Sequence, residues 1–367
     1  MRSLPYRSHL RRNVRLNRLV AVGSAALLTT IGFTTRAAAQ PAAAPVAPSL
    51  SSAVGVEYSQ AEYSQAEAQR IDAYWTPERM RDAAPMPAPT APVQYPQQIS
   101  LEKALPILSA PGQTPTSAMP NDPNSGVGTQ SFSRARQWTA HGRMPASSVG
   151  KLFYTEVDGN DSSCSGSVIT SRNRNTVWTA GHCVAEGGGG ASKIYKNFMF
   201  APDYNNGNGR QGRWTSPKIV GTTVGWQDQR NRYFDIGSVS FNPQPGLGNL
   251  QDRVGAQGYH FGYGQNFTDL NDFGYPDEGY QRTDFNGELL WYCNGNSVRS
   301  QFDDQLVMDC DMKAGSSGGP WLQDFRAARG WGYIVGTNSG NRGDIREFSA
   351  NHGNAAIDVY NLVVSRS

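Results

Sequence analysis

The residue Ser317 has a setting that could support nucleophilic catalysis. It stands in the turn 315–320, GSSGGP, where the glycines let the backbone turn sharply and aim two N–H groups at one point. A serine hydroxyl is a weak nucleophile until a base takes its proton, and converging N–H groups could stabilise the oxyanion that its attack creates. Ordinary Gly/Ser loops have similar sequences, so this prediction needs partner residues elsewhere.

His182 is the strongest candidate for the base. It lies in TAGHC at 179–183, directly after the strand-like run TVW, and a disulfide at the adjacent Cys183 could fix its backbone. If His182 were only a buried core residue, the position of Cys183 directly beside it would have no explanation. Of the other histidines, His260 remains possible as a base, whereas three have weaker settings: His9, His141 and His352.

Asp235 could orient the imidazole of such a base. It stands in YFDI at the start of an apolar run, where a carboxylate is costly to bury without a partner. An aspartate that only begins a strand is common. Between a candidate histidine and a candidate serine, however, a buried carboxylate completes the group that holds the imidazole in one tautomer and stabilises its protonated form.

Short strands must position these residues. From about residue 145 the sequence alternates strand-like runs with Gly/Asn/Asp turns, and from Asn354 the pattern NAAIDVYNLVV predicts one amphipathic helix capped by Asn354. Many short strands with one terminal helix indicate an all-β barrel or sandwich. The runs predicted as strands are 152–157, 164–170, 176–180, 235–241, 288–293, 306–312 and 331–339.

The N-terminal 39 residues have the order of a secretory signal peptide. An Arg-rich stretch, 1–18, precedes a mostly apolar run, 19–33, and the small residues 37–39, AAA, offer a cleavage site. At 15 residues the apolar run is short for a membrane anchor, which needs about 20. We therefore expect a secreted protein, extracellular or periplasmic, with no membrane contact after the signal is removed.

Export places the four cysteines in an oxidising environment. Four cysteines allow three pairings, and their order along the chain favours Cys164–Cys183 and Cys293–Cys310. No C-x-x-C is present and histidine is scarce, so a zinc site is not expected. An Asp/Asn-rich stretch, 203–208, could bind calcium, although a turn-rich hairpin explains it better.

Residues 40–144 form a separate segment rich in Ala and Pro, with 14 of the 22 prolines between positions 40 and 130. Most of it cannot bury enough apolar surface to fold, but 57–70 favours helix until Pro77, and an Ile/Tyr/Trp/Met cluster follows. We interpret the segment as a largely disordered propeptide that contacts the enzyme and keeps it inactive, with a flexible linker as the alternative. Cleavage is expected between about 131 and 150, at one of three arginines: Arg134, Arg136 and Arg143.

The charge of the chain gives no support for nucleic-acid binding. The net charge of +3 becomes −4 without the seven arginines of residues 1–39, which contain no acidic residue. The part that remains after signal removal is therefore mildly acidic, whereas nucleic-acid binding requires a basic surface.

The order His182, Asp235, Ser317, together with TAGHC, the cysteine at 164 and SGGP at 317–320, resembles the trypsin/chymotrypsin family of serine peptidases over roughly residues 148–367. The resemblance is strongest to the secreted bacterial branch that includes glutamyl endopeptidase-like enzymes. It implies two packed six-stranded antiparallel β-barrels with the active site in the cleft between them. The implied domain is a peptidase of residues 145–367 that needs no metal or organic cofactor.

The resemblance also implies a role for individual residues. His182 corresponds to the family's base, Asp235 to its orienting acid and Ser317 to its nucleophile, and the backbone N–H groups of Gly315 and Ser317 would form the oxyanion hole. Ser339 resembles the serine that borders the buried acid and the specificity pocket. Ser316 departs from animal trypsins, which have Asp there, so activation through that ion pair is not expected.

Two further residues bear on the choice of substrate. Asp311 lies six residues before Ser317, where trypsin-like enzymes place a pocket carboxylate that favours Arg or Lys. Asn338 occupies the position where glutamyl-specific relatives have a histidine that binds the substrate carboxylate. An amide cannot supply a positive charge, which argues against a preference for Glu. We thus expect a monomeric endopeptidase acting on polypeptides, with cleavage after basic residues. A broad or apolar preference is the alternative for the substrate residue, and a Glu/Asp preference is less consistent with Asn338. The alternatives are a non-catalytic binding or adhesion module of the same fold and, far less consistent with the residue order, an esterase of another fold.

Overall fold

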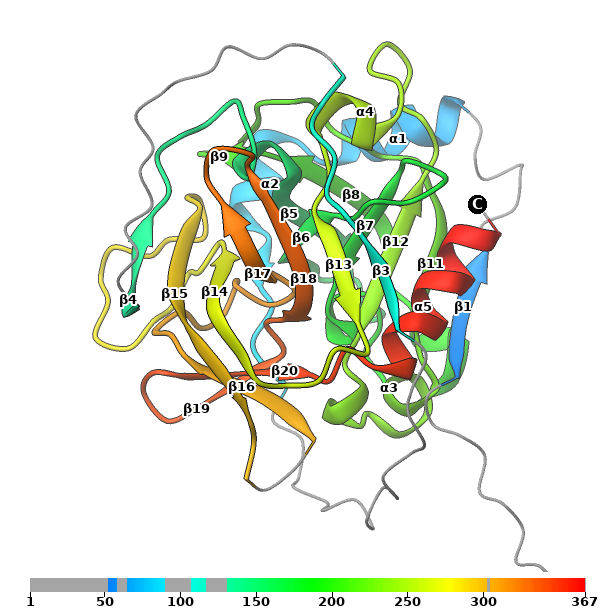
Figure 1. Cartoon of the computed structure of the whole chain (residues 1–367). Helices are drawn as coiled ribbons and strands as arrows, with labels where there is room; N and C mark the ends of the chain where they lie inside the picture. Colours follow the sequence, from blue (N-terminus) through cyan, green and yellow to red (C-terminus); the bar gives the residue numbers. More distant parts are fainter. Residues whose placement is uncertain (1–51, 58–64, 90–106, 117–130, 302–303, 367) are drawn as a thin grey trace, which may run out of the picture. The chain divides into compact units, whose positions relative to one another are not determined.

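The computed structural model describes residues 52–57, 65–89, 107–116, 131–301 and 304–366. The expected signal peptide, 1–39, lies outside the described residues. Two packed β-sheets and a few short helices account for most of the described chain (Figure 1), which confirms the all-β class.

The first sheet holds eight strands among the described residues, in the order β1-β11-β12-β7-β6-β5-β8, with β2 paired to β6. Six of them come from the region after residue 145, as the resemblance to trypsin implied, and the other two come from the segment before it. All its pairs are antiparallel except β2–β6, which is parallel. The strands are β1 (Ala53–Glu57), β2 (Ala84–Pro85), β5 (Val149–Thr155), β6 (Asp161–Val168), β7 (Thr176–Thr179), β8 (Lys196–Pro202), β11 (Pro217–Thr223) and β12 (Gly237–Phe241).

The second sheet holds ten strands among the described residues, in the order β19-β20-β16-β15-β14-β17-β18-β13-β3, with β4 paired to β15. Eight of them lie after residue 145, so this sheet is larger than the six strands implied by the resemblance. The strands are β3 (Leu108–Ala110), β4 (Phe132–Gln137), β13 (Gly258–Phe261), β14 (Phe267–Gly274), β15 (Trp291–Arg299), β16 (Gln305–Asp309), β17 (Pro320–Arg326), β18 (Trp331–Thr337), β19 (Gly340–Arg342) and β20 (Arg346–Ala350).

The helices are short, and the longest is the predicted C-terminal one, α5. It begins at Asn354, with Gly353 at the N-cap, so Asn354 is the first helical residue and not the expected cap. The buried side of α5 packs against β11, β12 and β1 (Figure 1). The other helices and 3-10 turns are α1 (Gln65–Tyr74), α2 (Pro77–Asp82), α3 (Val224–Gln229), α4 (Leu250–Val254), η1 (Ala146–Ser148), η2 (Gly181–Cys183), η3 (Gly190–Lys193) and η4 (Arg232–Phe234), and α5 spans Asn354–Ser365.

Three groups of buried apolar residues stabilise the sheets. One lies within the first sheet around Phe198 and Trp214, and one lies within the second around Leu270 and Trp321. The largest joins the two sheets and includes side chains of both, because strands of alternating pattern present one face to the partner sheet. Its members include Phe153, Trp178, Met199, Phe273, Leu322 and Ile334.

The structure joins Cys164 to Cys183 and Cys293 to Cys310, which is the pairing that their order along the chain favours. Each disulfide closes a loop of 19 or 17 residues. In the loop-entropy account each such closure stabilises the fold by about 3 kcal/mol.

The segment before residue 145 is more ordered than expected. Its described parts form α1, α2 and four strands, and all four strands add to the two sheets. The predicted helix is present as α1, and Pro77 begins α2, whose N-cap residue Thr76 accepts a hydrogen bond from Arg79 N. Within the described residues, no helix is both long enough and apolar enough to cross a membrane.

Candidate active site

His182 lies in η2, directly after β7, and the Cys164–Cys183 disulfide fixes the backbone beside it. Gly181 makes the approach to Asp235 possible: a Cβ there would lie 2.9 Å from Asp235 Oδ1. The indole of Trp226 packs edge-on against the imidazole, with 6.1 Å between the ring centroids. The disulfide, the close approach at Gly181 and the Trp226 ring together restrict the position of His182.

Asp235 is fully buried and receives three hydrogen bonds. Its Oδ1 accepts the backbone N–H of His182 at 2.7 Å, its Oδ2 lies 2.7 Å from His182 Nδ1, and the Ser339 hydroxyl donates to Oδ2 at 2.5 Å. An ionised carboxylate only accepts hydrogen bonds, so Nδ1 carries the proton and Nε2 keeps a free lone pair. This tautomer is the one that a general base requires.

Ser317 lies in the tight turn that leads into β17. Gly315 has φ +88°, and a Cβ at this position would lie 2.5 Å from the carbonyl oxygen of Tyr275. Only glycine fits both conditions without strain. The sequence GSSGG therefore determines the local backbone that presents the Ser317 hydroxyl.

Ser165 attaches this turn to the first sheet. Its backbone N–H donates to the carbonyl of Ser317 at 2.7 Å, and its hydroxyl donates to the carbonyl of Gly315 at 2.8 Å. The same hydroxyl accepts the N–H of Tyr275 at 2.9 Å. One small side chain on β6 thereby fixes the serine turn of the second sheet relative to the histidine of the first.

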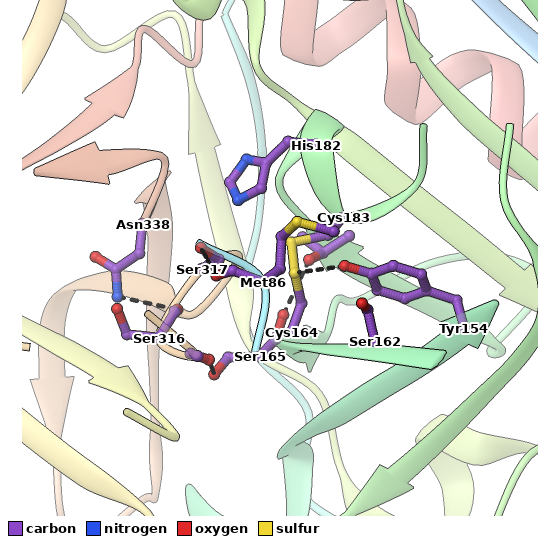
Figure 2. Close-up of a disulfide and its surroundings, with 12 residues drawn as sticks. Met86, Tyr154, Ser162, Cys164, Ser165, His182, Cys183, Ser316, Ser317 and Asn338 are labelled. Carbon is purple, nitrogen blue, oxygen red and sulfur yellow. Dashed lines mark hydrogen bonds between the residues drawn. A yellow bond between two sulfur atoms is a disulfide. The ribbon is translucent and has the colours of Figure 1, made fainter. Parts of the chain in front are cut away.

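The candidate site is covered by the chain itself. Only 4 % of Ser317 and 3 % of His182 are exposed. The Ser317 hydroxyl donates to the carbonyl oxygen of Met86 at 3.4 Å, and the N–H of Gly315 reaches the same oxygen at 3.4 Å. His182 Nε2 has no hydrogen-bond partner among the described residues. Figure 2 shows Met86 beside Ser317 and the disulfide.

The geometry can support base-assisted attack by a hydroxyl once the cover leaves. Rotation of the Ser317 hydroxyl toward Nε2 would supply the proton acceptor that a serine nucleophile needs. The N–H of Gly315 already donates to a carbonyl oxygen, which is the interaction an oxyanion hole makes.

The remaining described histidines have other partners. His141 Nδ1 lies 2.7 Å from Asp203 Oδ1, and its Nε2 contacts Asn205. His260 stacks on Tyr333 with ring centroids 3.6 Å apart. His352 accepts the indole N–H of Trp178, and complete burial lowers its pKa to about 4. Of the described histidines, His182 is the one placed in contact with Asp235.

Asp311 is not a free carboxylate. It is fully buried, its Oδ1 accepts the N–H of Ala135 at 2.7 Å, and its Oδ2 accepts Arg282 Nη1 at 3.0 Å. The Arg282 guanidinium also binds Asp284 and stacks over Phe285. The negative charge expected to attract a basic substrate residue is therefore already compensated by this chain.

Asn338 holds the turn that contains Ser317 through hydrogen bonds to Ser316 and Gly318. Its side-chain amide donates to Asp272 Oδ1 at 2.8 Å and to the carbonyl of Ser316 at 3.3 Å, and it accepts the indole N–H of Trp321 at 2.6 Å. Its backbone carbonyl accepts the N–H of Gly318 at 2.7 Å. Because these bonds occupy the amide, Asn338 acts on the turn and does not point a free group at a substrate.

A second carboxyl group lies beside Asp272 in this network. An oxygen of Asp272 and an oxygen of Glu347 lie within 4.8 Å of each other, and both residues are fully buried or nearly so. Burial raises the pKa of Asp272, and burial together with the charge of Asp272 raises the pKa of Glu347.

The stretch 203–208 forms a hairpin of β9 (Tyr204–Asn205) and β10 (Asn208–Gly209), as the turn-rich alternative predicted. Both oxygens of Asp203 are occupied, one by His141 Nδ1 and one by the N–H of Gly142. The side chain proposed as a calcium ligand thus serves to hold the chain at residues 141 and 142.

Sequence reasoning did not identify Ser165 or Met86. Ser165 follows the first cysteine of the Cys164–Cys183 disulfide in CSGS. A small residue with a hydroxyl group at this position could have indicated that another segment approaches the strand closely. Met86 acts through its backbone carbonyl, which every residue has, so its position in PMPAP carries no signal.

No protein-family model matches the chain, and no curated protein matches it in sequence. Solved structures do match. The protease Anisep from Arthrobacter nicotinovorans is 31 % identical, with a TM-score of 0.54, over 61 % of this chain and 99 % of that one. The thermostable serine protease AL20 from an extremophilic microorganism is 28 % identical, with a TM-score of 0.54, over 60 % of this chain and 99 % of that one.

The match to Anisep includes nearly the whole length of that protease at an identity above 30 %, and the sheets and the C-terminal helix agree with the fold implied by the sequence. The chain belongs to the trypsin-like family of serine proteases.

Proposed function

We propose that this chain is the precursor of a secreted serine endopeptidase whose catalytic residues are Ser317, His182 and Asp235. The observation that carries the proposal is the convergence of His182 N–H, His182 Nδ1 and the Ser339 hydroxyl on the buried Asp235 carboxylate. A carboxylate with these three contacts orients the imidazole and stabilises it when it becomes protonated. The turn of Ser317, tied to the first sheet by Ser165, supplies the nucleophile.

The reaction follows from these placements. Ser317 Oγ attacks the carbonyl carbon of a peptide bond while His182 Nε2 takes its proton, and the backbone N–H groups of Gly315 and Ser317 stabilise the oxyanion. His182 then gives the proton to the departing amine, which leaves an acyl group on Ser317. Water, deprotonated by His182, releases this acyl group. No step requires a metal or an organic cofactor.

The non-catalytic alternative is a binding or adhesion module that retains only the fold. Members of enzyme families that lose activity usually lose a catalytic side chain, whereas all three are present here. The contact of Asp235 with Ser339 also favours the enzyme, because a module that only binds has no need to orient His182.

Secretion is part of the proposal. The leader 1–39 has the order of a signal peptide, and two disulfides are typical of an oxidising compartment. The released enzyme would act on polypeptides as a monomer, without nucleic acid or membrane.

Processing is proposed to occur N-terminal to Ser131. Arg134 and Arg136 lie within β4, which pairs with β15, and Ala135 donates to Asp311, so cleavage inside this strand would disrupt the catalytic unit. N-terminal sequencing of the active secreted form is expected to give a start at or before Ser131, and Arg134→Ala should leave that start unchanged. A start between 138 and 150 would contradict this placement. Full activity of an uncut form beginning at Gln40 would contradict the propeptide itself.

The structure changes the basis for predicting substrate preference. Cleavage after basic residues requires a carboxylate able to bind them, and in this chain Arg282 and Ala135 occupy Asp311. We therefore propose that the processed enzyme has no strong preference for Arg or Lys as long as this ion pair persists, because the net charge of the pair is close to zero.

Digestion of a mixed peptide library by the processed enzyme tests both proposals. Hydrolysis that a fluorophosphonate abolishes is expected, with cleavage after Arg favoured by less than about tenfold over cleavage after Phe. Arg282→Gln should increase the relative cleavage after Arg by about tenfold, since it removes the closer of the two cations beside Asp311 and leaves Arg134 at 3.9 Å, while the matched variant Asp284→Asn should not. Absence of hydrolysis would refute the enzyme, and a strong Arg preference of the wild type that Arg282→Gln leaves unchanged would refute the role given to the ion pair.

A further inference from the structure

A short segment from the N-terminal part of the chain lies across the candidate site. Strand β2 pairs with β6 at Ser162 and Ser163, and the N–H of Met86 continues the pairing by donating to the carbonyl of Ser163 at 2.9 Å. The carbonyl of Met86 then accepts from Gly315 N–H and from the Ser317 hydroxyl, each at 3.4 Å. We call residues 83–86 the plug.

The plug is packed as well as hydrogen-bonded. The Met86 side chain is 9 % exposed and belongs to the apolar group that contains the Cys164–Cys183 disulfide and Tyr154 (Figure 2). Pro85 lies against Gly315, where a Cβ would meet the proline Cβ at 3.4 Å. A thioether fits such an irregular apolar site well because its side chain is unbranched and polarisable.

Helices α1 and α2, residues 65–82, attach the plug to the first sheet, and we call them the anchor. Trp75 is completely buried, its ring centroid lies 5.4 Å from that of Phe153, and its indole N–H donates to the carbonyl of Asn197 at 2.8 Å. Ile71 and Met80 are buried in the same group.

Polar contacts fix the orientation of the anchor. Asp161, the first residue of β6, accepts the hydroxyl of Tyr74 at 2.7 Å and Arg79 Nη1 at 2.7 Å. Arg213 pairs with Asp72 at 2.7 Å and donates to the carbonyl of Trp75 at 2.7 Å. Both partners, Asp161 and Arg213, belong to the proposed peptidase domain, so the anchor binds a surface that remains after processing.

We propose that the anchor and the plug form a built-in inhibitor of the proposed peptidase, in which the carbonyl of Met86 occupies the position meant for a substrate carbonyl. This inference rests on the proposed function. The Ser317 hydroxyl donates to the Met86 oxygen, and His182 Nε2 has no hydrogen-bond partner among the described residues, so the nucleophile is not hydrogen-bonded to its base while the plug is in place. A carbonyl that holds the hydroxyl through its oxygen is not attacked at its carbon, and the Met86–Pro87 bond therefore stays intact.

The arrangement makes activation a two-step process. A cut N-terminal to Ser131 separates the anchor and plug from the peptidase covalently, but the contacts of Trp75, Asp161 and Arg213 keep them bound. Active enzyme appears only when the cleaved segment also dissociates or is degraded. The lag between the two events depends on the strength of the anchor.

The test uses the secreted full chain and a fluorophosphonate probe, with labelling read separately on the gel bands of the intact precursor and the processed enzyme. The variants are Trp75→Ala in the anchor, Met86→Asp in the plug and, as a matched control, Gln69→Ala, which changes an exposed residue of α1. The thermal midpoint of each precursor shows whether it is folded.

We expect the wild-type precursor to label at least about 100-fold more slowly than the processed enzyme, because the competent state is only rarely populated. Trp75→Ala and Met86→Asp should each raise precursor labelling by about tenfold or more, since they remove buried apolar contacts or place a charge among them. Gln69→Ala should change nothing. Once the cleaved segment has been removed, the processed band should label equally in all four proteins.

Two results would overturn the inhibitor: a wild-type precursor that labels as fast as the processed enzyme, or a folded Met86→Asp precursor that labels as slowly as the wild type. Met86→Asp decides the matter if Trp75→Ala does not fold. A processed wild-type enzyme that has been separated from the cleaved segment and still resists the probe would instead refute the proposed function, so the two failures can be told apart.

Discussion

Replacing Ser317 with alanine is expected to lower the kcat for peptide hydrolysis by about 10⁶-fold, since a serine nucleophile and its base act as a unit. The fold should be retained because the hydroxyl makes a single 3.4 Å hydrogen bond, to the plug. Steady-state hydrolysis of a fluorogenic peptide by the processed variant gives the rate, and thermal unfolding gives the stability.

The neighbouring Ser316 provides the control. Its hydroxyl donates to the carbonyl of Lys313 at 2.7 Å, so Ser316→Ala removes a local bond and not the proposed nucleophile. We expect this variant to lose less than about tenfold in kcat. Comparable losses in the two variants would show that the turn, and not the Ser317 hydroxyl, is what activity requires.

Asp235→Asn is expected to lower kcat by about 10⁴-fold at pH 7. An amide is close in size to the carboxylate but cannot accept from both His182 N–H and Nδ1–H in the same way, so the imidazole adopts the tautomer with its proton on Nε2. The substrate KM should change little, because Asp235 is fully buried and does not face the substrate. The pH dependence of kcat/KM, compared with the wild type, is the measurement.

Ser339→Ala serves as the comparison for that variant. It removes one of the three donors to Asp235 and leaves the two bonds to His182. A loss of about tenfold or less in kcat is expected, about the value of one hydrogen bond to a charged group. Retention of more than a tenth of wild-type kcat by Asp235→Asn would refute the orienting role.

Local features of the sequence predicted much of the fold. Every run predicted as a strand overlaps a strand of the structure, with ends shifted by up to six residues. Alternation and β-branched residues indicate that a strand is present more reliably than they indicate where it begins and ends. The glycines of the two motifs were also informative. Gly181 and Gly315 each allow another group to approach the backbone so closely that a Cβ would not fit.

Long-range pairing could not be predicted. Asp311 and Arg282 are 29 residues apart, and the contact of Asp311 with Ala135 joins residues 176 apart, so no local pattern shows that the carboxylate is already neutralised. The four strands β1 to β4 that the N-terminal segment adds to the sheets were missed because the Pro-rich composition of that segment favours disorder. The plug joins residues 231 apart through a backbone carbonyl, which has no residue-specific signal.

The position of α5 has a consequence for when activity can arise during synthesis. The first sheet is encoded mostly before residue 242, but the helix that covers β11 and β12 is the last element of the described chain. A Cβ at Gly55 would lie 3.0 Å from Leu362 of α5, and a Cβ at Gly221 would lie 2.7 Å from Val363, which shows how closely the helix packs. A growing chain consequently cannot bury this face until residues 354–365 have been made, since contacts of such sequence separation form only when both partners exist. We therefore expect the proposed activity to arise only after α5 has been made.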